Sequence, residues 1–171
     1  GSVIKATAID PSMVVDGIYK HTAKVKAFTS ERAAIAAVKE KRLEPADILV
    51  YIGGGPMGTG MEETAQITAA LRYLPWGKTV SILTDARFSG FSTGACIGHI
   101  GPEALAGGPI GKLRDGDVVE IIIDQNKLQG TLNLLEANGE KDVDNILKTR
   151  AIHPEVKRHP QLPDDTRLWA A

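Results

Sequence analysis

The sequence predicts a single α/β domain, because strand-like and helix-like segments alternate along its 171 residues. Two short apolar runs, Ile48–Ile52 and Val80–Leu83, are bounded by turn residues and are typical of buried strands. Between them, a helix starting at about Met61 carries apolar side chains at the i, i+3, i+4 and i+7 positions, namely Ile67, Ala70, Leu71 and Leu74. At 43% hydrophobic residues, a chain of this length can bury one core.

The other predicted elements continue this alternation. In chain order they are a strand at Val3–Ile9, a strand at Lys24–Phe28, a helix beginning after Ser30, two strands at Val118–Ile123 and Leu128–Leu135, and a short helix at Val143–Arg150. Ser30 is a favourable N-cap, and Glu31 lies in the first turn, where a negative charge is stabilised. Val118–Ile123 is the longest β-branched run, and we expect it to pair with the run that follows it.

Composition excludes several classes of function. The 20 basic and 21 acidic residues nearly cancel, so no charge field favours a nucleic acid or a membrane surface. Cys96 is the only cysteine, which excludes a disulfide framework or a cysteine ligand set within this chain. We therefore expect a cytoplasmic protein.

The ends of the chain suggest an excised fragment. Gly1 and Ser2 resemble a cloning scar, and the chain stops within an apolar segment at residues 168–171. We expect residues 3–152 to form one C-terminal domain that lacks its own last residues. Residues 153–171 are rich in proline and charge, and we expect a truncated, extended and poorly packed tail.

A glycine-rich loop, Gly53–Gly60, lies between the first buried strand and the following helix. Its five glycines leave backbone N–H groups uncovered at a helix N-terminus, which predicts an anion site. Gly53, Gly55 and Gly58 also fit the pattern G-x-G-x-x-G, with Asp85 ending the next strand. This alternative is a dinucleotide-binding half domain, although Pro56 removes one of the N–H groups that a pyrophosphate needs.

The densest cluster of chemical groups is the segment TDARFSGFSTGACIGHIGPEA at residues 84–104. So many small and hydroxyl residues indicate close backbone approach or exposed hydroxyl groups. The segment resembles the "TDGRFSGG…GH…PEA" signature of the dihydroxy-acid and phosphogluconate dehydratases, with Ala86 and Phe91 where the family has glycine. The Gly53–Gly60 loop resembles the family's "GPKGGPGMPE", but the family's lysine there is Met57 or Gly58.

This resemblance implies a swivelling β/β/α barrel-like domain with flanking helices, which closes over a large N-terminal domain. The family's members are hydro-lyases that convert 2,3-dihydroxy acids or sugar acids to 2-keto acids, using an iron–sulfur cluster and Mg²⁺. The cluster ligands would lie outside this chain, which agrees with the lone Cys96. The partners implied are the chain's own N-terminal domain, a second copy in a homo-oligomer, and an aldonate substrate. The aldonate is preferred because residues 91–93 and 55–57 look closer to members acting on sugar acids such as xylonate or arabinonate. A non-catalytic docking module is a further alternative.

The resemblance also assigns roles to residues. Ser89 is the candidate general base, while Ser92, Thr93 and Arg87 are candidates for binding substrate. Glu63, whose spacing to Ser89 matches the family without a gap, is the candidate metal ligand, and the adjacent Glu62 is the fallback.

Each assignment has a structural alternative. Ser89 fits a simple turn hydroxyl or a helix N-cap, and Ser92 or Thr93 fits the cap of a helix running into Ala95–Ile97. Arg87 fits an ion pair with Asp85 or with another carboxylate.

Overall fold

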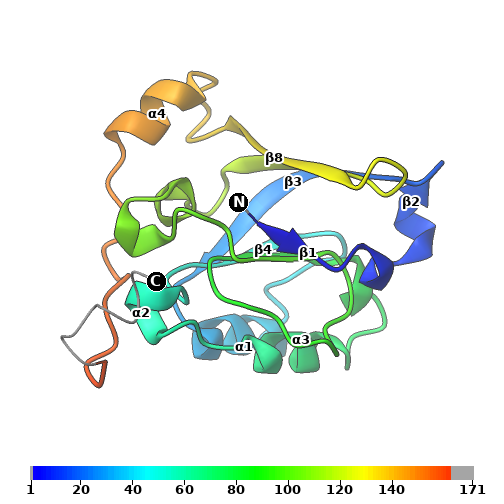
Figure 1. Cartoon of the computed structure of the whole chain (residues 1–171), viewed down its shortest axis with the longest axis horizontal. Coiled ribbons are helices and arrows are strands. Elements are labelled where there is room, and N and C mark those ends of the chain that lie inside the picture. Colours follow the sequence, from blue (N-terminus) through cyan, green and yellow to red (C-terminus); the bar gives the residue numbers. More distant parts are fainter. Residues whose placement is uncertain (1, 163–171) are drawn as a thin grey trace.

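The computed structural model describes residues 2–162, which form a mixed α/β domain around one curled sheet (Figure 1). The strands are β1 (Val3–Ile4), β2 (Val14–Val15), β3 (Ile18–Phe28), β4 (Ile48–Tyr51), β5 (Ser81–Thr84), β6 (Cys96–Gly98), β7 (Val118–Asp124) and β8 (Gln129–Glu136). The α-helices are α1 (Glu31–Lys39), α2 (Pro56–Thr59), α3 (Ala65–Leu71) and α4 (Val143–Thr149). Short 3₁₀ turns lie at Ala6–Ala8, Pro11–Met13, Gly77–Thr79, Ala104–Ala106 and Pro109–Lys112. The predicted α/β class is confirmed.

The sheet runs in the order β1-β6-β5-β4-β3-β7-β8, with β2 paired to β3 outside this path. Strands β6, β5, β4 and β3 are parallel, whereas β1, β7 and β8 join in antiparallel pairs. Strand β3 joins the two parts of the sheet, because residues 25–28 pair with β4 and residues 18–24 pair with β7. The predicted hairpin of β7 and β8 is confirmed.

Both faces of the central strands are buried, which explains the continuous apolar run of β4. Ile48, Val50 and Ile52 face the inner core of the curled sheet. Leu49 and Tyr51 face the opposite way, into a second cluster that includes residues of α1 and α3. Figure 1 shows these two helices side by side beneath the sheet.

Three predicted boundaries are wrong. The strand expected at Val3–Ile9 ends at Ile4, because its neighbour β6 has only three residues to pair with. Strand β3 starts at Ile18 rather than Lys24, because β7 supplies a long antiparallel partner. The helix expected from about Met61 begins only at Ala65, as α3, and it is preceded by the separate short helix α2, which ends where Gly60 adopts a left-handed conformation at φ 78°.

The prediction of a poorly packed tail is also wrong for its first part. Val156 is buried and belongs to the inner core, and the backbone N–H of His159 donates to the Gly58 carbonyl at 2.7 Å. The segment after His153 therefore packs against the glycine-rich loop. Residues 163–171 of that predicted tail, and Gly1 of the predicted cloning scar, lie outside the described residues. In the described range, no helix is long and apolar enough to cross a lipid bilayer.

Candidate functional site

The carboxylate of Asp85 binds backbone groups of the glycine-rich loop instead of facing a ligand. It follows β5 and is almost fully buried. Its oxygen Oδ1 accepts hydrogen bonds from the backbone N–H groups of Gly53 at 3.0 Å and Gly54 at 2.9 Å, and Oδ2 accepts one from Ala104 at 2.9 Å. Burial raises the pKa of Asp85, and these three backbone donors oppose that shift. The carboxylate thus joins the loop after β4, the end of β5 and the last residue of the signature segment at one point.

A second carboxylate covers the start of α2. Glu103 accepts the backbone N–H of Met57 at 2.9 Å, and a side chain at Gly55 would collide with it. Burial raises the pKa of Glu103, which the backbone donors of Met57 and Gly58 oppose. The prediction that these N–H groups form an open anion site is therefore wrong, because the protein's own carboxylates accept them.

This geometry also removes support from the dinucleotide alternative. A pyrophosphate needs the N–H groups that Asp85 and Glu103 already accept. The loop is further closed by its own glycines, since a Cβ at Gly58 would lie 2.0 Å from the Gly53 carbonyl oxygen. Glycine at Gly53 suits its φ of +90°.

Ser89 lies in an exposed turn after β5. Its hydroxyl accepts the backbone N–H of Phe91 at 3.1 Å, and its carbonyl accepts the N–H of Ser92 at 3.1 Å. The prediction that the Ser89 hydroxyl forms a hydrogen bond within a turn is thus confirmed. The half-buried Ser89 also lines a cavity. The helix expected at Ala95–Ile97 is wrong, because β6 forms there and neither Ser92 nor Thr93 caps a helix.

Ser92 carries the most unusual polar group of the region. Its side chain is only 3% exposed, and its hydroxyl oxygen has no hydrogen-bond partner within residues 2–162. A buried hydroxyl without a partner costs about 1–3 kcal/mol, so such groups are rare in folded domains. Thr93 is half-buried, and its backbone carbonyl accepts the Cys96 thiol at 3.5 Å.

Ser89 and Ser92 line one small cavity of about 160 Å³. The cavity is also lined by Lys5 from the N-terminal segment and by His99, which follows β6. His99 is exposed. Ser89, Ser92, Lys5 and His99 therefore lie around one cavity, although the Ser92 hydroxyl oxygen is itself buried and the Lys5 ammonium group donates to the Gly90 carbonyl.

Four other predicted site residues do not line this cavity. Arg87 forms an ion pair with Glu63, with Nη1 2.7 Å from Oε2, and its Nε donates to the Met61 carbonyl. The partner of Arg87 is thus Glu63 rather than Asp85. Glu62 lines a separate cavity of about 450 Å³ together with Glu31. The structure brings Ser89 and Ser92 together, while the residues lining their cavity do not include Arg87, Glu62, Glu63 or Thr93.

This chain supplies few groups for a metal or a cluster. The described part contains no group of three histidine, cysteine or acidic side chains that could hold a metal ion. Glu63 is partly exposed and offers carboxylate oxygens, so it fits the role of one ligand in a site completed from elsewhere. Cys96 does not fit a cluster ligand, because burial raises the pKa of its thiol to about 12.

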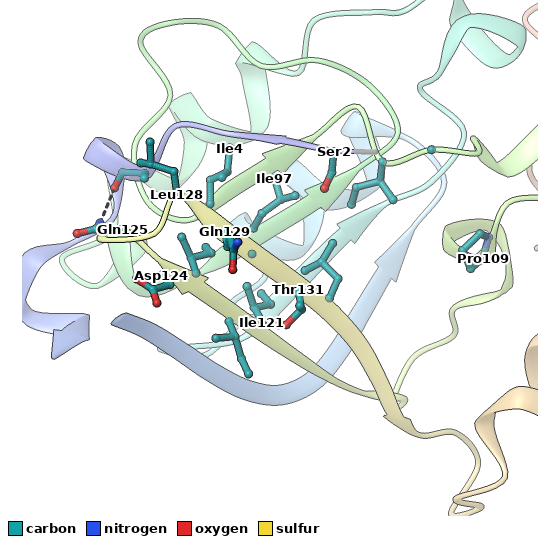
Figure 2. A pocket seen from close by; sticks show the side chains of 17 residues that line it. Ser2, Ile4, Ile97, Pro109, Ile121, Asp124, Gln125, Leu128, Gln129 and Thr131 are labelled. Atoms are coloured by element: carbon teal, nitrogen blue, oxygen red, sulfur yellow. Dashed lines mark hydrogen bonds between the residues drawn. The ribbon is translucent and has the colours of Figure 1, made fainter. Parts of the chain in front are cut away.

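A cavity of about 470 Å³ lies between the sheet edges, away from these residues (Figure 2). Ile4, Ile97 and Ile121 line it together with the β8 residues Gln129 and Thr131. Its lining is mainly apolar, and it contains none of the predicted site residues. Figure 2 marks one hydrogen bond between the lining residues, which the Gln125 side chain donates to the Ala6 carbonyl at 3.1 Å.

Sequence reasoning missed Lys5 and the roles of Asp85 and Glu103. Lys5 reaches the Ser89 turn from 85 residues away, and no local pattern signals such a contact. Asp85 stood within the signature, but only the fold shows that its oxygens face backbone N–H groups.

Residues 1–159 match the family profile described as "Dihydroxy-acid/6-phosphogluconate dehydratase C-terminal". The chain is 57% identical over 180 aligned positions to D-xylonate dehydratase YagF and 56% identical over 177 positions to D-xylonate dehydratase YjhG, both from Escherichia coli K12. It is 37% identical over 163 positions to the dihydroxy-acid dehydratase of Oleidesulfovibrio alaskensis.

These alignments cover 100%, 99% and 95% of the chain, but only 27%, 27% and 28% of the relatives. The chain thus spans about a quarter of the length of the proteins it matches. The match extends through the glycine-rich loop, the Ser89 turn and the β7–β8 hairpin. The chain belongs to the dihydroxy-acid/6-phosphogluconate dehydratase family, as a C-terminal domain of that family.

Proposed function

We propose that this chain is the C-terminal part of a hydro-lyase that dehydrates a sugar acid, an aldonate, to a 2-keto-3-deoxy acid. Ser89 is the general base of this reaction, and Ser92 is a hydrogen-bonding partner of the substrate. The substrate class is supported by the identities of 57% and 56% to two D-xylonate dehydratases, which exceed the 37% to a dihydroxy-acid dehydratase.

The observation that carries this proposal is the buried, unpartnered hydroxyl of Ser92, a residue that lines the same cavity as Ser89. A buried polar group without a partner requires a specific explanation, and a ligand that supplies the partner is the one proposed here. A polyol acid offers both donors and acceptors, which match a serine hydroxyl on either side. Thr93 and Arg87 complete the proposed substrate contacts once another domain covers this surface.

The reaction moves one proton and one hydroxyl group. Ser89, whose own proton has passed to solvent, accepts the proton from C2 of the aldonate, while the C3 hydroxyl takes up one proton from solvent and leaves, so the net change is the loss of one water molecule. The resulting enol then tautomerises to the 2-keto acid. Since a serine hydroxyl is a weak base at its ordinary pKa, its site must favour the deprotonated form.

Glu63 is the proposed metal ligand of this chain, and Glu62 the fallback. When bound, a divalent cation such as Mg²⁺ and an iron–sulfur cluster would supply the Lewis acidity that promotes loss of the C3 hydroxyl. Glu63 must then exchange or share its contact with Arg87. The buried Cys96 leaves the cluster ligands to the N-terminal domain, which is the proposed partner of this chain in a homo-oligomeric, cytoplasmic enzyme.

A chimera tests the proposal directly. This chain replaces the aligned 27% of D-xylonate dehydratase YagF, and D-xylonate turnover is measured. Ser89→Ala should lower kcat about 10²–10⁴-fold, as expected for the loss of a general base. Ser12→Ala is the matched control, because Ser12 is exposed and bonds only locally to Asp10. Near-normal kcat in Ser89→Ala would exclude the base assignment.

Glu63 and Glu62 are separated by the same chimera. Glu63→Gln should raise the Mg²⁺ concentration required for half-maximal activity, whereas Glu62→Gln should change it little. The opposite result would transfer the metal role to Glu62. The isolated chain should turn over no aldonate, and measurable turnover would refute the idea that it carries only part of the site.

A further inference from the structure

The Ser89 turn is held by few packing contacts. A Cβ at Gly90 would meet no atom within 4 Å, and Phe91 is 81% exposed. The two hydrogen bonds within the turn, from the N–H groups of Phe91 and Ser92 to Ser89, shape it locally. They do not fix its position relative to the sheet, so other contacts must do so.

Two cationic side chains supply such contacts. The ammonium group of Lys5, just after β1, donates to the Gly90 carbonyl at 2.6 Å. The guanidinium group of Arg72, at the C-terminal end of α3, donates to the neighbouring Phe91 carbonyl. Consecutive carbonyl groups of the turn are thus held from two separate elements, 85 and 19 residues away in the sequence.

Lys5 differs from Arg72 in one respect. Lys5 also lines the cavity that Ser89 and Ser92 share, whereas Arg72 does not. Arg87, the cation predicted for substrate, is engaged by Glu63 instead. Lys5 is therefore the cationic side chain at the Ser89 cavity.

We propose that Lys5 and Arg72 are positioning residues that clamp the Ser89 turn in its reactive geometry. The proposal rests on the proposed role of Ser89 as a base. Each cation holds a backbone carbonyl, so neither needs to contact the reacting atoms. Because a displacement of about 1 Å at a reacting group can cost about 10²-fold in rate, a turn whose tip at Gly90 and Phe91 has few packing contacts needs such anchors.

The mobility of the turn in the isolated chain tests the clamp without catalysis. Backbone ¹⁵N relaxation is measured for residues 89–92 in the parent chain, Lys5→Met, Arg72→Met and the double variant. The order parameters should fall from about 0.85 toward 0.6 or below in the double variant, with smaller changes in the single variants. Lys20→Met and Arg42→Met are the controls, because each cation is exposed and paired with a glutamate elsewhere. Unchanged order parameters in the double variant would overturn the proposal.

Kinetics of the chimera described above test whether the clamp serves the reaction. Lys5→Met should lower kcat by about 10- to 100-fold with KM changed less than about threefold, because positioning acts on the chemical step. Lys5→Arg should restore most of kcat, since it keeps a cationic donor. A mobile turn with an unchanged kcat would overturn the proposal, as would a rise in KM alone.

Failure of the two proposals can be told apart. Near-normal kcat in Ser89→Ala would remove the base assignment, while the relaxation measurements would still decide whether Lys5 and Arg72 hold the turn. Unchanged relaxation together with a strong effect of Ser89→Ala would overturn the clamp and leave the base assignment standing.

Discussion

Replacing Asp85 by asparagine should destabilise the domain far more than its conservative chemistry suggests. The Asp85 carboxylate accepts three buried backbone N–H groups with its two oxygens. Asparagine keeps one oxygen and places an amide NH₂ where the other stood. If the NH₂ group replaces Oδ2, the backbone N–H of Ala104 loses its acceptor. If the NH₂ group replaces Oδ1, the backbone N–H of Gly54 loses its acceptor instead.

The magnitude follows from the donors affected. One buried N–H without an acceptor costs about 1–3 kcal/mol, and the remaining bonds lose roughly 1 kcal/mol of charge assistance. Relief from burying a charge offsets part of this loss, because burial already raises the pKa of Asp85. We expect Asp85→Asn to lower the free energy of unfolding by about 2–4 kcal/mol, and the Tm by roughly 5–15 °C.

Urea unfolding of the 171-residue chain, followed by far-UV circular dichroism, measures this change. Asp115→Asn is the matched control, because Asp115 is exposed and accepts a single backbone N–H, that of Ala27. The control should lose less than about 1 kcal/mol. Equal losses in the two variants would show that Asp85 does not organise the glycine-rich loop and would refute the account of the site given above.

Three further outcomes are expected for the isolated chain. Ser92→Ala should raise the free energy of unfolding by about 1 kcal/mol in urea titrations, because it removes a buried hydroxyl that has no partner in the described structure, and a clear loss would reveal a partner. Gly58→Ala should destabilise the domain strongly or prevent folding, since its Cβ would lie 2.0 Å from the Gly53 carbonyl oxygen. Gly90→Ala places its Cβ in open space and should shift Tm by less than about 3 °C. Equal shifts of Tm in the two variants would contradict this contrast. Cys96 should resist thiol reagents at pH 8 until the chain is unfolded, because burial raises its pKa from 9.0 to about 12. Between these pH values only the thiol of the unfolded chain ionises, so the contribution of Cys96 to the free energy of unfolding is present below pH 9 and lost as pH rises toward 12. Between pH 7.5 and 10.5, the free energy of unfolding should therefore fall by roughly 2 kcal/mol more in the parent chain than in Cys96→Ala. Parallel pH profiles of the two proteins would exclude this ionisation.

The sequence by itself determined the class of fold and the family. The apolar runs of β4 and β5 are unambiguous because each strand is buried on both faces. The β7–β8 hairpin and α4 were predictable from patterns local to each segment. The signature after β5 pointed to the dehydratases because its residue types and spacing are specific.

Only the tertiary structure decided how the site is assembled. The start of β3 depends on β7, about a hundred residues later, so no local pattern encodes it. The N–H groups of the glycine-rich loop were predicted to be open, yet Asp85 and Glu103 accept them from other elements. The contact of Lys5 with the Ser89 turn likewise exists only because β1 pairs with β6 at the sheet edge. Such contacts depend on the relative placement of distant segments, which the packing of the curled sheet determines.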